Sequence, residues 1–240
     1  MVLSGCATDG ALAQPAAVPL PYADDLGGGA RPEQFLFYGG FDLWRNGYAG
    51  YGGMQWAPTG DLNKDGFVVR LFMSDGFERY DAPLQRFDTN IFRASILPGW
   101  RVKRGNLEIK VFAGPAVENH VLMPDVPTNP LRGAHFGAQA LTELWWEPTQ
   151  KTMVSASALI TTIGTGYSAR LAGGWRLLDR FWIGPEILAS SDEFSTQYRI
   201  GAHVTGFRTG NVEWSLATGF VEDSYHRSGV YGRISVLTRQ

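Results

Sequence analysis

The segment Asp61-x-Asn63-x-Asp65-Gly66 has the spacing of the first half of a calcium-binding loop, in which alternating oxygen ligands and a glycine turn surround the ion. The twelfth position of such a loop supplies a bidentate glutamate, but here it is Phe72. Lys64 adds a positive charge inside the segment. We therefore interpret the segment as an Asp-, Asn- and Gly-rich turn. We expect no metal and no other cofactor.

Lipid hydrolysis by a membrane barrel would need a serine with a histidine in reach. The histidines of the chain are His120, His135, His203 and His226. By alternation His135 and His203 fall on the polar face of their segments, as do Ser155 and Ser157. A pair that acts on lipid should face outward near the membrane surface, and the pattern places no histidine there. The sequence therefore favours a protein without catalytic residues and leaves a lipid-modifying enzyme as the least favoured alternative.

Charged side chains of both signs recur at alternate positions of β-like segments, so they share one face of each strand. They are Asp42, Arg70, Arg93, Arg101, Glu108, Lys110, Glu143, Arg170, Arg176, Glu186, Arg199, Glu213 and Arg233. In a small barrel such charges pair with one another and fill the interior, because unpaired buried charge is costly. We take these residues as the candidates that face the lumen.

The opposite face of the same segments is apolar. In residues 211–221, for example, Val212, Leu216 and Phe220 alternate with Glu213 and Ala217. A soluble β-sandwich would bury this apolar face against a second sheet, whereas a transmembrane barrel turns it outward to lipid. The alternation alone leaves both folds open.

Segment length and number favour the membrane barrel. The chain has 240 residues, a net charge of −2 and 44% hydrophobic residues, without an apolar run long enough for a membrane-spanning helix. About twelve segments alternate: 34–45, 47–59, 66–79, 89–103, 106–119, 131–146, 150–164, 166–178, 180–191, 195–207, 211–221 and 229–239. Most match the roughly 9–11 residues that a tilted strand needs to cross a bilayer. We predict an all-β fold, a closed antiparallel transmembrane β-barrel over residues 34–240.

The connections predict how this barrel sits in the membrane. Short periplasmic turns are expected at 61–65, 104–105, 148–149, 178–179 and 209–210, and longer extracellular loops at 80–88, 119–130 and 222–228. Tryptophans gather near the periplasmic turns and tyrosines toward the other edge, as in the aromatic girdles of barrels. The tryptophans are Trp56, Trp100, Trp145, Trp146, Trp175, Trp182 and Trp214. The tyrosines are Tyr48, Tyr51, Tyr80, Tyr167, Tyr198 and Tyr231.

Residues 1–33 have the character of an incomplete export signal followed by a flexible periplasmic lead. Leu3-Ser4-Gly5-Cys6 has the form of a lipoprotein cleavage box, so Cys6 is a candidate for lipidation. Ala11-Leu12-Ala13 has the form of an ordinary signal-peptidase site, which would instead remove Cys6. The first 13 residues contain no Lys or Arg, so we expect the true start codon to lie further upstream.

Several stretches resemble the family of cellulose biosynthesis protein BcsS. They are residues 60–71, Arg132-Gly133 with residues 143–149, residues 181–186 and residues 201–208, and the resemblance extends over about 34–240. It implies a secreted barrel in the outer membrane of a Gram-negative bacterium, associated with cellulose, an exopolysaccharide of biofilms. The partners expected from it are outer-membrane lipid and cellulose or components of the cellulose synthase complex, with no nucleic acid. A non-enzymatic accessory in export or anchoring is the first reading, and a general small-solute pore is the alternative.

Overall fold

The computed structural model describes residues 33–58, 60–82, 85–125, 132–191 and 196–240, so the predictions for Cys6 and residues 1–32 lie outside the described part. Within it the chain forms twelve strands and one short 3-10 helix. They are β1 (Phe35–Trp44), β2 (Gly47–Trp56), β3 (Gly66–Ala82), β4 (Gln85–Arg104), β5 (Leu107–Met123), β6 (Gly133–Thr149), β7 (Thr152–Thr161), η1 (Ile163–Thr165), β8 (Tyr167–Leu177), β9 (Phe181–Ser191), β10 (Thr196–Thr209), β11 (Val212–Asp223) and β12 (Ser228–Arg239).

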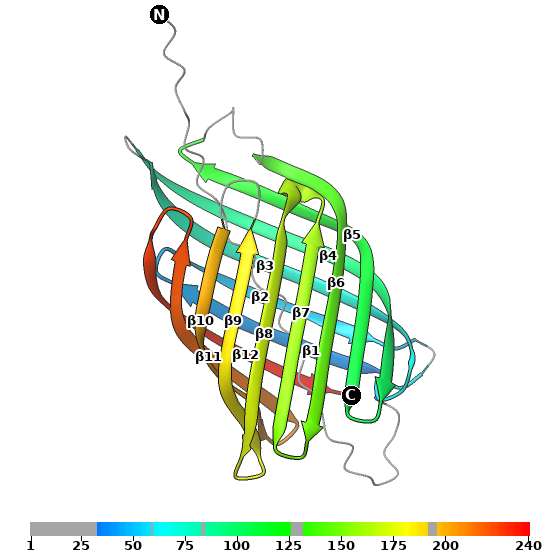
Figure 1. Cartoon of the computed structure of the whole chain (residues 1–240). Coiled ribbons are helices and arrows are strands. Elements are labelled where there is room, and N and C mark those ends of the chain that lie inside the picture. The colour runs from blue at the N-terminus through cyan, green and yellow to red at the C-terminus, as the bar shows by residue number, and fades with distance from the viewer. Residues whose placement is uncertain (1–32, 59, 83–84, 126–131, 192–195) are drawn as a thin grey trace, which may run out of the picture.

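The strands form one closed antiparallel barrel, in which each strand pairs with its neighbours in sequence and β1 pairs with β12 (Figure 1). Next to this closing pair, the backbone N–H of Phe35 donates to the carbonyl of Gln240 at 2.9 Å. The predicted fold class is confirmed. We call the end that holds Phe35 and Gln240 the proximal end and the opposite end the distal end. None of the described helices is long and apolar enough to cross a membrane.

The two faces of the strands follow the predicted alternation. On β11, Leu216 and Phe220 are 51% and 70% exposed on the outside, whereas Glu213 and Ala217 are buried on the inside. A solvent-exposed apolar exterior around a polar interior is the pattern of a barrel that meets lipid. Side chains alternate between the two faces of a strand, so the face of each residue could be predicted without knowing which strands pair with it.

The connections at the proximal end are short, and only residues 105–106, 150–151, 178–180 and 210–211 separate consecutive strands there. Gly105 has a φ of 57°, the left-handed conformation that such a tight hairpin turn needs. The remaining proximal connection, 57–65, is longer and folds back into the barrel opening. There the N–H of Leu62 donates to the carbonyl of Glu33 at 2.7 Å.

The predicted long distal loops are wrong in extent, because the strands continue through them. β3 runs to Ala82 and β4 begins at Gln85, β5 runs to Met123, and only residues 224–227 separate β11 from β12. In this region both faces carry polar groups. Arg79 and Asp88 pair on the outside, where Nε and Oδ1 lie 2.9 Å apart, and Glu78 and Thr89 are buried on the inside. The alternation of apolar and polar residues disappears where both faces of the sheet meet water, although the backbone hydrogen bonds between the strands continue.

β6 extends further than its neighbour β7 at the distal end. It pairs with β5 as far as Gly133, opposite His120, but pairs with β7 only up to Gln139, opposite Thr161. Beyond that point Ala138 binds Thr162, whose N–H donates to the Ala138 carbonyl at 2.9 Å. In the described part of the chain no strand lies beside the remaining edge, Gly133–Gly137.

The girdle prediction is only partly right. Trp56, Trp100, Trp146 and Trp175 are exposed on the outside. Trp145 and Trp182 are instead buried inside, where they pack with Met153. Tyr231 is also an interior residue, buried against Ala217 and Val221. Closeness to a strand end does not fix the face, because the face depends on whether the position is odd or even within the strand.

Candidate functional site

The barrel interior holds the charged residues that the sequence singles out, and one group of them is centred on Glu186 of β9. Its Oε2 accepts bonds from Arg170 Nη2 at 2.7 Å and from Arg233 Nη2 at 2.7 Å. Its Oε1 accepts a third bond, from the Tyr231 hydroxyl at 2.8 Å. Arg170 also reaches the hydroxyl of Ser155 at 3.3 Å. One buried carboxylate thus joins β8, β9 and β12 across the lumen.

A second contact joins β1 and β10. Nη1 of Arg199 lies 2.9 and 2.7 Å from the two carboxylate oxygens of Asp42, and both side chains are buried. The guanidinium also lies over the rings of Trp44 and Tyr231, 5.2 and 5.3 Å from their centres. These rings shield the ion pair from water and add cation–π attraction.

A third group links β2 to β6 on the other side of the interior. Glu143 binds Arg70 and accepts a bond from Gln55 at 3.3 Å. Lys110 lies 2.9 Å from Glu108 and 3.7 Å from Glu143, and so connects two carboxylates. Arg101 Nη2 completes the chain by donating to Glu108 Oε2 at 2.6 Å.

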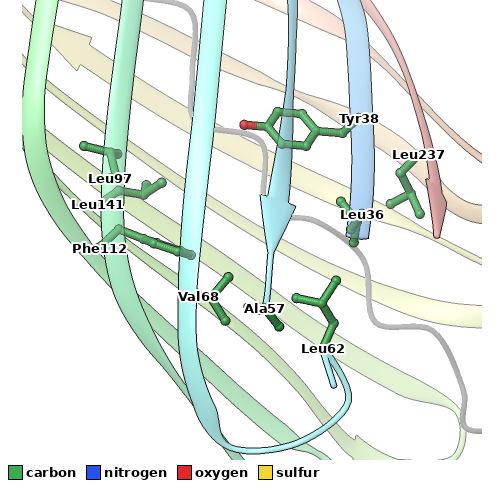
Figure 2. Packing of buried hydrophobic residues seen from close by; sticks show 9 residues of the cluster. All are labelled: Leu36, Tyr38, Ala57, Leu62, Val68, Leu97, Phe112, Leu141 and Leu237. Carbon is green, nitrogen blue, oxygen red and sulfur yellow. The ribbon is translucent and has the colours of Figure 1, made fainter. Parts of the chain in front are cut away.

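Apolar side chains pack together inside the barrel toward its proximal end (Figure 2). Leu62 from connection 57–65 faces Leu36 and Leu237 at the junction of β1 and β12. Leu97, Phe112 and Leu141 form the other side of the same cluster. Leu62 and Phe112 are only 2% and 1% exposed, so the cluster excludes water from this part of the lumen.

Two further candidates lie near the proximal end. Arg176 donates to Glu147 at 3.2 Å and lies 4.3 Å from the centre of the Trp182 ring. Glu213 accepts a bond from Arg208 at 3.2 Å. Glu147 was not among the predicted residues, although it has the same strand parity as Glu143.

The candidate Arg93 lies in the distal half, where the sequence reasoning missed its partners. Arg93 Nε lies 3.3 Å from Glu118 Oε2, and Nε2 of His120 lies 3.2 Å from the same oxygen. The His120 ring meets the His135 ring edge-on, with their centres 6.4 Å apart. Glu118 and His120 continue the parity of Glu108 and Lys110, and this signal could have found them.

The 61–66 segment forms a turn, as interpreted from the sequence. The N–H of Asn63 donates to Oδ1 of Asp61 at 2.9 Å, which is an Asx turn. Asp65 accepts a bond from the backbone N–H of Lys103 at 2.6 Å and another from the Arg104 guanidinium, and these two bonds lower the pKa of its carboxyl group. No group of three or more metal-ligating residues occurs among the described side chains.

The interior leaves little room where the Glu186 group meets the proximal half. The cavity lined there by Trp145, Ser155, His203 and Ser215 has a volume of about 10 Å³, which is about the space of a single water molecule.

These features define a barrel of the outer-membrane type, with an apolar exterior and an ion-paired interior. Solved structures share the fold. An outer-membrane channel from Pseudomonas putida F1 has a TM-score of 0.55 at 8% identity, over 92% of this chain and 100% of that one. A deletion mutant of the monoaromatic hydrocarbon channel TodX has a TM-score of 0.57 at 7% identity, over 87% of this chain and 90% of that one.

The family model of cellulose biosynthesis protein BcsS matches residues 36–240. The chain therefore belongs to this family, and the resemblance found in the sequence is confirmed. No curated protein matches the chain.

Proposed function

We propose that this barrel is a non-enzymatic accessory of cellulose production in the outer membrane of a Gram-negative bacterium, where it assists export or anchoring of the polymer. Membership of the BcsS family supports the pathway. The observation that carries the accessory role is the closed interior, in which ion pairs and a proximal apolar cluster occupy the path that a solute would take.

The distribution of interior charge argues against a general pore. A pore needs water along its length, whereas Glu186, Glu143 and Glu108 each bind two cationic side chains inside the barrel. Two of these contacts, Arg233–Glu186 and Arg70–Glu143, join strands that are not neighbours. Leu62 and its apolar neighbours form a buried cluster toward the proximal end. Opening a path would require breaking buried ion pairs, at a cost of about 3–5 kcal/mol for each pair.

The small-solute pore remains the second candidate because both structural relatives described above are named as channels. At 7–8% identity that likeness concerns the fold alone. Planar-bilayer recording of the refolded full chain separates the two functions. We expect no stable conductance steps, whereas regular single-channel steps would favour the pore.

The positions of three of the four histidines support a role without catalysis. His120 and His203 are buried inside the barrel, and Nε2 of His203 lies 3.1 Å from the Gly173 carbonyl. His135 lies on the interior wall beside His120. A catalytic pair for lipid would need to reach the outer face, and none of these three histidines does.

Deletion of the gene tests the proposed pathway. The deletion strain should make less cellulose at its surface, or fibres with altered organisation, and expression of the wild-type chain should restore both. Candidate partners are cellulose itself and the cellulose synthase complex. Unchanged cellulose yield and fibre order, with the barrel verified absent from the membrane, would refute the proposal.

A further inference from the structure

An exposed aromatic ring on the outer face of β4 is bordered by polar side chains. Phe92 is 38% exposed and points outward, whereas its neighbour Arg93 is buried inside. The direct partners of Phe92 in the strand register are Asp75 on β3 and Asn119 on β5. Asn90 is the next outward residue of β4. Residues directly opposite each other have Cβ atoms about 5 Å apart, so a carboxylate and an amide flank the ring on its two sides.

Two further rings continue the aromatic surface across β3 and β2. Phe77 is the register partner of Asn90, and Tyr48 is the register partner of Phe77. The rings of Tyr48 and Phe77 stack, with their centres 5.7 Å apart and an angle of 23° between their planes. We call this group of aromatic and polar side chains the outer patch. Its members are Tyr48, Asp75, Phe77, Asn90, Phe92 and Asn119.

The outer patch lies where the apolar belt of the barrel ends. On β3 the outward residues from Phe67 to Met73 are all apolar, and Asp75 is the next outward residue. On β5 the outward residues from Leu107 to Val117 are all apolar, and Asn119 is the next. Charged and amide groups are costly in hydrocarbon, so these side chains should lie at the distal membrane surface or beyond it. The distal end is the predicted extracellular side.

Phe220 on β11 shows how an outward ring of the apolar belt differs. It is 70% exposed, and its register partners Ile200 and Val230 are both apolar. Apolar neighbours suit contact with an acyl chain, whereas the carboxylate and amides beside Phe92 offer hydrogen-bond donors and acceptors. The polar border therefore distinguishes Phe92 from a ring that only meets lipid.

The chemistry of the outer patch indicates the class of its ligand. A sugar ring has apolar C–H faces, which pack on aromatic rings, and hydroxyl groups at its edge, which bond to carboxylates and amides. The charge of the patch comes from the Asp75 carboxylate. Arg79, an outward cation of β3, lies 2.9 Å from Asp88. The phosphate groups of lipopolysaccharide would need an unpaired cation, so the patch suits a neutral saccharide better.

We propose that the outer patch binds a neutral glucan chain at the cell surface, with one sugar ring stacked on Phe92 and its hydroxyl groups bonded to Asp75 and Asn119. The choice of a glucan rests on the proposed function in cellulose production. The ligand stays outside the barrel, so binding is compatible with a closed interior.

Co-sedimentation of the detergent-solubilised full chain with amorphous cellulose tests the proposal. We expect the wild-type chain to bind and soluble cellohexaose to release it. Phe92→Leu keeps an apolar side chain but removes the ring, and Asn119→Ala removes an amide beside it. Each variant should weaken binding about threefold to tenfold, because one stacking contact or one hydrogen bond is lost.

Phe220→Leu is the matched control, because it removes an outward ring whose register partners are apolar. It should leave binding to cellulose unchanged, and the thermal midpoint of each variant verifies that the barrel is folded. If Phe92→Leu does not fold, Asn119→Ala decides. Absence of wild-type binding would overturn the site, as would equal losses in Phe220→Leu and the patch variants.

The same chains should also be tested on immobilised lipopolysaccharide. Retention there that depends on Phe92, without binding to cellulose, would assign the outer patch to the lipid of the outer leaflet and overturn the glucan site. A cellulose defect in the deletion strain would still uphold the proposed function, so the two failures are distinguishable.

Discussion

Arg233 and Glu186 meet inside the barrel although two strands separate them on the sheet. Nη2 of Arg233 lies 2.8 Å from Oε1 and 2.7 Å from Oε2 of Glu186. β12 and β9 are separated by β11 and β10, so the contact passes through the interior between strands that are not neighbours. Because Arg170 binds the same carboxylate, Glu186 holds two guanidinium groups together that would otherwise repel each other.

Replacing Glu186 should therefore be more damaging than replacing either arginine. Glu186→Gln leaves two buried cations uncompensated and should lower the free energy of unfolding by at least about 3–5 kcal/mol, measured by denaturant unfolding in detergent or lipid. Arg170→Gln should cost less, since Arg233 and Tyr231 still bind Glu186. Arg79→Gln, at a half-exposed pair, is the control and should cost less than about 1 kcal/mol. Equal losses for Glu186→Gln and Arg79→Gln would contradict this account of the interior.

The outer face of β11 should not tolerate charge. Leu216 points outward, so Leu216→Arg should reduce stability in lipid by about 2–4 kcal/mol if it lies near the bilayer midplane. Leu216→Ala keeps the face apolar and should cost less. Refolding yield and unfolding in vesicles would measure both variants. Comparable stability of the arginine variant and the wild type would mean that this face does not contact lipid.

Sidedness can be measured with single cysteines in a chain whose native Cys6 is replaced by serine. Cysteine at Asp125, whose side chain is 55% exposed, or at Ser224 should react with an impermeant maleimide on whole cells. Cysteine at Asp179, in the proximal connection 178–180, should react only after the outer membrane is broken. The opposite labelling pattern would reverse the orientation predicted from the connections.

The turn at Asp65 should contribute stability that depends on pH. The bonds from the Lys103 N–H and the Arg104 guanidinium lower the pKa of Asp65 below its ordinary value of 3.8. The contribution is therefore fully present above pH 3.8 and disappears as pH falls through the lowered pKa. At neutral pH the thermal midpoint of the wild type should be higher than that of Asp65→Asn. In strong acid the two midpoints should become equal. If the thermal midpoints still differ in strong acid, the difference in stability does not come from the charge of this carboxylate.

The faces and the number of strands could be predicted from the sequence because each depends on local order. Alternation assigned the outward and inward sides of β11 correctly, and turn residues such as Gly105 marked the strand ends. The distal strand ends could not be found this way. Around Arg79 and Asp88 both faces are polar, so the pattern there resembles that of a loop.

The pairing of the interior charges could not be predicted either. Asp42 and Arg199 are 157 positions apart in sequence and meet only because the barrel closes between β1 and β12. The placement of Trp145 could have been predicted in part. Adjacent residues of a strand face opposite sides, so either Trp145 or Trp146 had to be inside.

The edge of β6 with which no described strand pairs also determines how deeply the barrel is immersed. Hydrocarbon cannot satisfy the backbone groups of an open strand edge, so Gly133–Gly137 must stand in water or beneath another molecule. Phe136, on the same edge, is 84% exposed and would otherwise favour the lipid. The membrane surface is therefore expected to cross β6 on the proximal side of residue 138. This edge fixes the depth of the barrel in the bilayer without reference to its aromatic residues.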